Sequence, residues 1–121
     1  MERQSVAGIG GVVLFADHAD SLAHWYEKHL GLHFNREPES HFWWVELPGT
    51  SFAIHQTNHP LGHEHRQVEI TWVVADLDAF IEHLGELGAT VEERQETSTG
   101  DFAWLDDPEG NRIELYQKPD V

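Results

Sequence analysis

The stretch DDPEGNRIELYQ, residues 106–117, contains a compact turn followed by an alternating strand. A proline and a glycine mark the turn, and in the strand Ile113 and Leu115 point to one face. Glu114 and Tyr116 point to the other face. A carboxylate in an apolar strand is usually exposed, paired or bound to a metal, because burying an unpaired charge is costly. The role of Glu114 is therefore central to the function.

Hydrophobic periodicity predicts an α+β fold built from two tandem βαβββ modules. In the first module we expect a strand at residues 9–16 and a helix at 21–30, with Asp20 as N-cap and Gly31 as C-cap, then strands at 34–37, 41–47 and 51–57. In the second module we expect a strand at residues 67–75, a helix at 78–87 ending before Gly88, and strands at 90–97, 101–106 and 111–117.

The two modules align with each other in sequence. Residues 11–16, GVVLFA, fall on residues 69–74, EITWVV, at an offset of 58, and residues 49–56, GTSFAIHQ, fall on residues 110–117, GNRIELYQ, at an offset of 61. Such a small drift fits loops of different length, so the pattern indicates an internal duplication. We therefore predict a single domain over residues 1–121, made of module 1 (7–57), a linker (58–66) and module 2 (67–118).

The charge and cysteine content of the chain limit the kinds of ligand and partner that we expect. The 22 acidic and 7 basic residues give a net charge of −15, so nucleic acid and anionic membranes are not expected as partners and cationic ligands are favoured. The chain has no cysteine, which excludes disulfides and thiolate metal sites. Neither a signal peptide nor a membrane-spanning segment is recognisable, and we expect a cytoplasmic protein.

Two regions carry a resemblance to a known family. GGVVLFADHADSLAHWYEKHLGL (residues 10–32) and the pair VVADLDAFIEHLGELGATV (73–91) and FAWLDDPEGNRIELYQ (102–117) resemble the vicinal oxygen chelate superfamily. This superfamily includes glyoxalase I, bleomycin-resistance proteins, fosfomycin-resistance enzymes and extradiol dioxygenases. The resemblance implies curled mixed sheets that enclose a cup, commonly completed across a homodimer, with a small molecule bound inside.

The resemblance also implies positions for a divalent metal, with ligands on the first and fourth strands of each module. In module 1 these positions fall on Gly11 and Ala53, which cannot ligate, whereas in module 2 they fall on Glu69 and Glu114, which can. His55 shares a face with Ala53 and is a candidate third donor. We expect no cofactor; the alternative is a divalent metal (Mn, Fe, Mg, Ni or Zn) held by His55, Glu69 and Glu114.

If no metal binds, Glu69 and Glu114 could have other roles. If Glu69 and Glu114 lie close together, they share a proton and act as catalytic general base, or they hold a basic group of a ligand. The structural alternative is that Arg112, Arg66 or a backbone donor satisfies each carboxylate.

Aromatic side chains are the second group of residues that could bind a ligand. Alternation sends Phe42 and Trp44 to one face and Trp43 to the other, so at least one tryptophan should meet a pocket or an interface. An apolar cup edged by aromatics suits a flat or cationic ligand. Core packing is the alternative for each ring. The predicted ligand-binding residues are Trp44, His55, Phe102, Trp104 and Tyr116.

The linker sequence NHPLGHEHR, residues 58–66, is rich in histidine, but its proline and glycine predict a solvated loop rather than a metal site. Two functions then remain open. One is a metal-free binding protein, similar to bleomycin-resistance proteins, which the missing side chains at Gly11 and Ala53 favour. The other is a metal-dependent lyase, isomerase or dioxygenase, which Glu69 and Glu114 favour.

Overall fold

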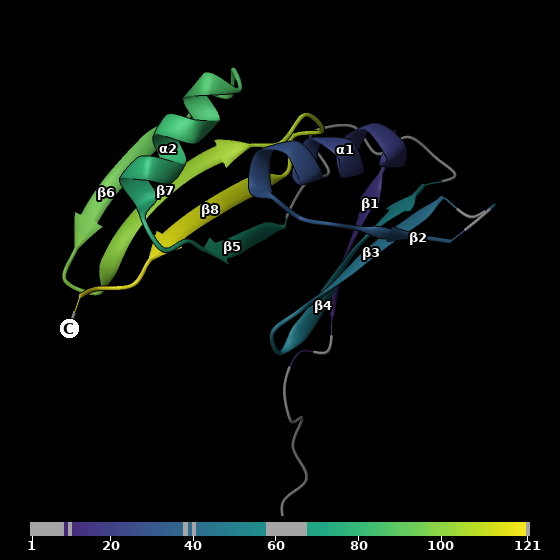
Figure 1. Ribbon diagram of the computed structural model, residues 1–121, viewed down its shortest axis with the longest axis horizontal. Coiled ribbons are helices and arrows are strands. Elements are labelled where there is room, and N and C mark those ends of the chain that lie inside the picture. Colours follow the sequence, from purple (N-terminus) through teal and green to yellow (C-terminus); the bar gives the residue numbers. More distant parts are fainter. Residues whose placement is uncertain (1–8, 10, 38, 40, 58–67, 121) are drawn as a thin grey trace, which may run out of the picture. The chain divides into compact units, whose positions relative to one another are not determined.

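The computed structural model describes residues 9, 11–37, 39, 41–57 and 68–120, and it contains two compact units, Met1–Pro60 and Leu61–Val121. The predicted βαβββ order is confirmed in both units (Figure 1). Unit 1 contains β1 (Val12–Ala16), α1 (Ala19–Leu30), β2 (Asn35–Arg36), β3 (Phe42–Leu47) and β4 (Thr50–Gln56). Unit 2 contains β5 (Glu69–Val73), α2 (Leu77–Glu86), β6 (Glu93–Thr97), β7 (Gly100–Asp106) and β8 (Arg112–Gln117).

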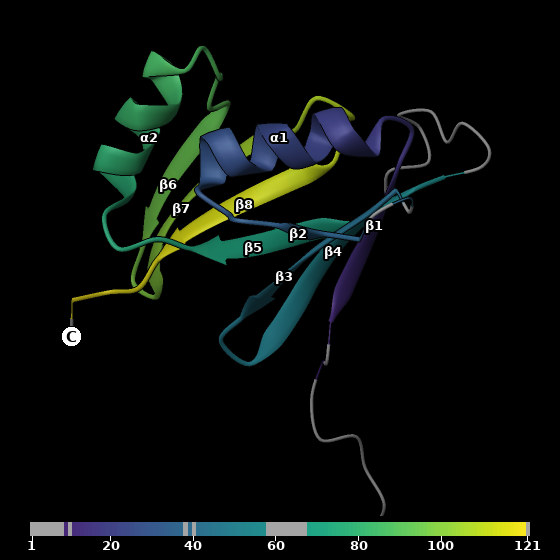
Figure 2. The same cartoon turned by 45° about the vertical axis from the view of Figure 1, so that its right-hand side comes forward.

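Each unit forms one four-stranded mixed sheet, which confirms the α+β class. The strand orders are β1-β4-β3-β2 and β5-β8-β7-β6. The first strand of each unit runs parallel to the last one, and the other neighbours are antiparallel. Figures 1 and 2 show β5, β8, β7 and β6 side by side in this order. Both units therefore place their first and last strands next to each other.

Each helix packs on one face of its own sheet, α1 against β1, β3 and β4, and α2 against β7 and β8. The apolar cores lie on these faces. The largest fully buried side chains are Leu22, Tyr26, Phe52 and Ile54 in unit 1, and Leu77, Leu84, Leu105, Ile113 and Leu115 in unit 2. Burial of each such side chain contributes about 1.5–3 kcal/mol relative to exposure. We call the opposite face of each sheet the open face.

The alternation predicted for Phe42, Trp43 and Trp44 is confirmed. Trp43 is 7% exposed and lies on the helix side, where its Nε1 donates to Asp20 Oδ1 at 2.8 Å. The Arg36 guanidinium lies 5.2 Å from the centroid of the Trp43 ring. Phe42 and Trp44 are half-buried on the open face.

The predicted N-cap of the first helix is wrong. Helix α1 begins at Ala19, and Asp20 lies inside its first turn. The first N–H group is satisfied from a distant strand instead, because Ala19 N donates to Gln56 Oε1 at 2.9 Å. Gly31 adopts a left-handed conformation as the C-cap, as predicted.

The second helix begins in the same way. Leu77 N donates to Gln117 Oε1 at 2.7 Å, and Gln117 aligns with Gln56 in the duplication. Asp76 is the N-cap and accepts from Ala79 N at 3.0 Å. A glutamine at the end of the last strand therefore ties the helix start to the sheet in both units. The described residues include no helix with the length and apolar character needed to span a membrane.

The turn that precedes β8 is held by one buried carboxylate. Asp107 Oδ1 accepts from Glu109 N and Asn111 N at 2.9 Å each, and Oδ2 accepts from Asn111 Nδ2 at 2.8 Å. Gly110 has a φ of +87°, a conformation that favours glycine. Asp107 therefore fixes the connection that sets the register of β7 against β8.

We expect the substitution Asp107→Ala to destabilise the protein by about 2 kcal/mol, because it leaves three buried donors without their acceptor. The free energy of unfolding measured in urea checks this value. Asp106→Ala is the matched control: Asp106 is exposed and pairs with Arg112, so its loss should cost less than about 1 kcal/mol. Equal losses in the two variants would contradict the role of Asp107.

Candidate functional site

The strand register arranges the open face of unit 1 in three rows across β1, β4 and β3. Each row holds one side chain from each strand, and the middle member comes from β4. The rows are Gly11, Ser51 and Glu46; Val13, Ala53 and Trp44; and Phe15, His55 and Phe42.

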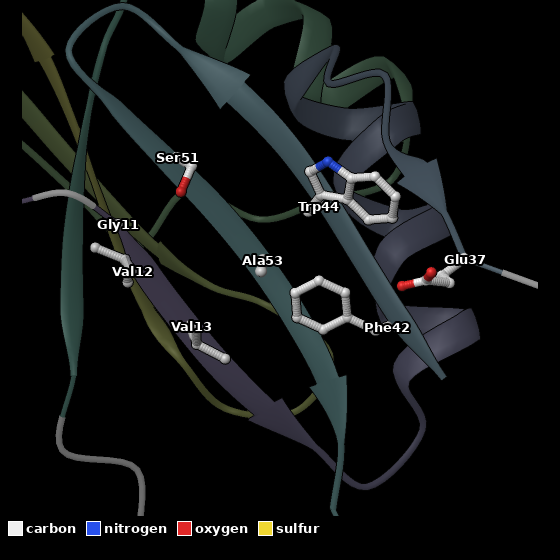
Figure 3. A pocket seen from close by; sticks show the side chains of 8 residues that line it. All are labelled: Gly11, Val12, Val13, Glu37, Phe42, Trp44, Ser51 and Ala53. Atoms are coloured by element: carbon white, nitrogen blue, oxygen red, sulfur yellow. The ribbon is translucent and has the colours of Figure 1, made fainter. Parts of the chain in front are cut away.

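A hollow of about 270 Å³ lies on this face (Figure 3). It is slightly smaller than the usual ligand pocket, which measures about 300–1,000 Å³. Ala53 is at its centre, between Val13 on one side and Trp44 on the other. The hollow is lined by Gly11, Val12, Val13, Glu37, Phe42, Trp44, Ser51 and Ala53. Trp44 thus lines a hollow, and its role in ligand binding stays a prediction.

Gly11 and Ser51 meet at one end of the hollow. A Cβ added at Gly11 would lie 2.6 Å from Ser51 Oγ, closer than side chains approach each other. The space in which a side chain at position 11 would stand is therefore taken by the Ser51 hydroxyl. A histidine at this position would require Ser51 to move.

Stacked rings form one wall of the hollow. The centroids of Phe42 and Trp44 are 5.8 Å apart and the ring planes are 23° from parallel. Phe42 also contacts His55, with ring centroids 5.6 Å apart. A flat ligand could add a further ring to such a stack.

His55 is exposed at the edge of the same face. Its ring contacts Phe15 and Phe42, and its Nδ1 lies 2.8 Å from Gln56 O. Because a carbonyl oxygen only accepts, Nδ1 is the donor in this contact, and a ligand or metal role for His55 would fall to Nε2. The predicted position of His55 on the face of Ala53 is confirmed by the register.

The open face of unit 2 has the same three rows across β5, β8 and β7. The rows are Glu69, Arg112 and Asp106; Thr71, Glu114 and Trp104; and Val73, Tyr116 and Phe102. Glu114 takes the place that Ala53 has in unit 1, and Trp104 takes the place of Trp44. Where unit 1 has a hollow, unit 2 has a carboxylate.

The Glu114 carboxylate is half-buried and held by two neutral donors. Its Oε1 accepts from Thr71 Oγ1 at 2.7 Å, and its Oε2 accepts from Trp104 Nε1 at 3.0 Å. No arginine, lysine or histidine in the described part of the chain pairs with it. The carboxylate is thus oriented by hydrogen bonds without being neutralised by a cation.

Arg112 does not satisfy either predicted acid. Its guanidinium pairs with Glu92 and Asp106, and the hydrogen bond with Glu92 is the main cause that raises the pKa of Arg112 above its usual value. Glu69 is exposed and lies on the same face as Glu114, one row away. The register thus places both acids on one face, and their joint action stays a prediction. Arg66, the other predicted partner, lies outside the described residues.

The three remaining predicted binding residues form one aromatic cluster. Phe102 stacks on Trp104 with centroids 6.0 Å apart and planes 11° from parallel, and on Tyr116 with centroids 4.9 Å apart. The Tyr116 hydroxyl donates to Thr99 O at 2.8 Å. The cluster and Glu114 share the open face, so an aromatic surface borders a carboxylate, as the strand alternation predicts.

Two of the four metal positions that the superfamily resemblance implies hold no side-chain donor in this chain. Gly11 and Ala53 supply no donor atom, and Ser51 fills the space beside Gly11. Within the ranges that the structure describes, no three histidine, aspartate or glutamate side chains form a group that could hold a metal ion. His55 belongs to unit 1 and the two glutamates to unit 2, so the set of His55, Glu69 and Glu114 stays a prediction.

Sequence reasoning missed three residues of these faces: Val13, Ser51 and Thr71. Val13 lies across from Ala53, Ser51 lies across from Gly11, and Thr71 lies across from Glu114, all on the open faces. The parallel register of the first and last strands would have identified them, but period-two alternation alone does not give that register. The histidine-rich linker, residues 58–66, lies outside the described residues.

The fold is shared with solved structures of similar length. A putative glyoxalase family protein from Bacillus anthracis has a TM-score of 0.79 at 19% identity, over 98% of this chain and 100% of that chain. A lactoylglutathione lyase from Agrobacterium tumefaciens has a TM-score of 0.73 at 17% identity, over 94% and 96% of the two chains. A glyoxylase/bleomycin resistance protein/dioxygenase domain from Frankia sp. EAN1pec has a TM-score of 0.67 at 21% identity, over 98% and 95%.

Sequence comparison identifies the family. None of the curated proteins matches the chain significantly. The model of the glyoxalase-like domain matches residues 11–116, which include both βαβββ units and both open faces. The chain therefore belongs to the glyoxalase-like domain family, in agreement with the resemblance to the vicinal oxygen chelate superfamily.

Proposed function

We propose that this protein binds a small aromatic molecule, neutral or cationic, in the hollow of unit 1, and that it does so without the four-ligand metal site of its superfamily. The hollow itself carries the proposal. It lies over Gly11 and Ala53, two residues with little or no side chain. The short side chain of Ala53 leaves space for a ligand at the centre of the hollow, and neither Gly11 nor Ala53 supplies a side-chain donor for a metal.

The lining of the hollow favours a flat ligand. Val13 and the stacked rings of Phe42 and Trp44 supply apolar walls, and Ala53 allows a ring to approach the sheet closely. Removing apolar surface from water is the main driving force for such binding, at roughly 25 cal/mol per Å². Ser51 adds a hydroxyl for orientation.

Charge supports a ligand that is neutral or positive. Glu37 is exposed at the rim of the hollow, Glu46 lies on the same open face, and the chain carries a net charge of −15. A negative surface potential raises the local concentration of cations and lowers that of anions. Aromatic rings also attract cations through their π faces.

Filling the hollow should abolish binding. We expect Ala53→Leu to weaken the binding of N-methylquinolinium and of coumarin by at least about tenfold, because the added side chain occupies the centre of the hollow. Titrations followed by tryptophan fluorescence or calorimetry measure the affinities. Ala53→Ser is the matched control, since it changes the same residue while keeping the space, and its affinities should stay within about threefold of the parent protein.

Salt separates the two probes in the same titrations. The affinity for N-methylquinolinium should fall as salt rises from low to physiological concentration, and that for coumarin should not, because salt screens only the charged ligand. Unchanged affinities in Ala53→Leu would contradict binding in the hollow, provided that circular dichroism shows a folded protein.

A metal-dependent lyase, isomerase or dioxygenase is the second candidate. It is favoured by Glu114, a half-buried carboxylate that no cationic side chain of the described residues neutralises. With Glu69 and His55, it would offer two oxygen donors and one nitrogen donor. A bound divalent ion would supply Lewis acidity to a substrate oxygen.

Elemental analysis decides between the two candidates. We expect tag-free protein, produced in medium supplemented with Mn, Fe, Ni and Zn, to retain far less than one metal ion per chain after dialysis, because two of the four inherited ligand positions hold no donor. Stoichiometric metal that disappears in Glu114→Gln would overturn the metal-free proposal and establish the second candidate. Asp106→Asn, a change of charge on the same face of the neighbouring strand, serves as control.

Two further expectations belong to this proposal: a cytoplasmic location and a homodimer. The absence of cysteine agrees with a reducing compartment. Val13 and Phe15 on the open face of unit 1 and Val73 on that of unit 2 are 46%, 54% and 63% exposed, which is apolar surface that a partner would cover. Sedimentation velocity at micromolar concentration tests the dimer.

A further inference from the structure

The hydroxyl of Ser51 has a defined direction at one end of the hollow. The three atoms nearest to a Cβ built at Gly11 all belong to Ser51: Oγ at 2.6 Å, the backbone oxygen at 3.4 Å and Cβ at 3.9 Å. Because Oγ is closer than the Cβ that carries it, the hydroxyl points from β4 toward Gly11. Figure 3 shows the Ser51 oxygen on the side of the strand that faces Gly11.

The space over Gly11 is part of the hollow, because Gly11 and Ser51 both line it. Ala53, at the centre, follows Ser51 by two positions on the same face of β4, which corresponds to about 6.6 Å along the strand. An aromatic ring over Ala53 that carries one substituent spans this distance. The Ser51 hydroxyl therefore lies at the edge of the place that the ring of a ligand would occupy.

The polar groups around the hollow favour an uncharged partner for this hydroxyl. A serine hydroxyl has one donor and two acceptor positions, so it can bind a ligand in addition to a contact that it makes within the protein. Glu46 is exposed and faces Ser51 in the register of β3 and β4, and Glu37 lines the hollow. These two acids disfavour an anion beside Ser51.

The equivalent end of unit 2 has a different chemistry. Arg112 stands in the place of Ser51 in the duplication, and its guanidinium pairs with Glu92 and Asp106. This end of unit 2 thus presents an ion-paired arginine. Of the two units, unit 1 is the one that offers an uncharged donor and acceptor there.

We propose that Ser51 determines the specificity of the hollow: its hydroxyl binds an uncharged hydroxyl or carbonyl oxygen on the edge of the ligand's aromatic ring. Gly11 is the positioning residue, because it leaves the space in which the hydroxyl lies. This inference rests on the proposed binding function. A ring without such an oxygen would take water away from the Ser51 hydroxyl and give it no new partner, which costs affinity. The ligand class narrows to phenols and aromatic carbonyl compounds.

Phenol and toluene test the role of the hydroxyl, because they are flat rings of nearly equal size that differ by a hydroxyl in place of a methyl group. Titrations followed by nitrogen-15 NMR give both affinities. The ratio of the affinity for phenol to that for toluene should fall by roughly fivefold in Ser51→Ala, because one hydrogen bond is lost. Ser21→Ala, the same change in helix α1, should leave the ratio unchanged.

The variant Gly11→Ala tests the positioning role. Its Cβ forces the Ser51 hydroxyl to move, and the protein should still fold, because Oγ is the end of a rotatable side chain. The phenol-to-toluene ratio should fall about as far as in Ser51→Ala. In the double variant Gly11→Ala/Ser51→Ala, the ratio should equal that of Ser51→Ala alone, since no hydroxyl remains to be displaced. Gly85→Ala is the matched control, because no atom lies within 4 Å of its added Cβ.

The possible failures are distinguishable. A ratio that stays unchanged in Ser51→Ala, with both compounds bound, would overturn the inference and leave the binding function standing. A further fall in the double variant would show that position 11 acts on the ligand directly, and would overturn the positioning role of Gly11. If coumarin, phenol and toluene all fail to bind at millimolar concentration, the proposed function fails and the inference with it.

Discussion

The parallel pairing of the first and last strands in each unit is the constraint on which the open faces depend. Because side chains alternate along a strand, one register decides which residues become neighbours on a face. In unit 1 that register sets Val13 beside Ala53, and in unit 2 it sets Thr71 beside Glu114. A slip of one residue would send these side chains into the cores. The buried side chains on the other face, such as Phe52 and Ile113, therefore fix the register of the strands and with it the positions of the open-face residues.

Two copies of one supersecondary unit have diverged at the centre of this face. Unit 2 has a carboxylate there, oriented by a hydroxyl and an indole, whereas unit 1 has the equivalent indole and an alanine. The difference changes what the position can bind. A carboxylate attracts cations and metals, and an alanine leaves apolar space. One substitution thus separates the chemistry of the two halves.

Local pattern was sufficient to predict the fold but not the partners of its polar groups. Alternation sent Phe42 and Trp44 to one face and Trp43 to the other, and Gly31 was predicted to end the first helix; both predictions are confirmed. Asp20 was wrongly predicted as a cap, because the helix start binds Gln56, a residue far along the chain. Arg112 likewise pairs with Glu92 and Asp106. Contacts of this kind depend on the register between strands, which a sequence pattern does not contain.

The residue at position 53 decides how much of the open face of unit 1 is filled. A glutamate there would occupy the hollow. Alanine keeps the space open but supplies no side-chain oxygen. At Gly11, a side chain would require the Ser51 hydroxyl to move, because a Cβ there would lie 2.6 Å from Ser51 Oγ. Unit 1 therefore offers a side-chain donor at neither of the two metal positions that the superfamily resemblance implies for it.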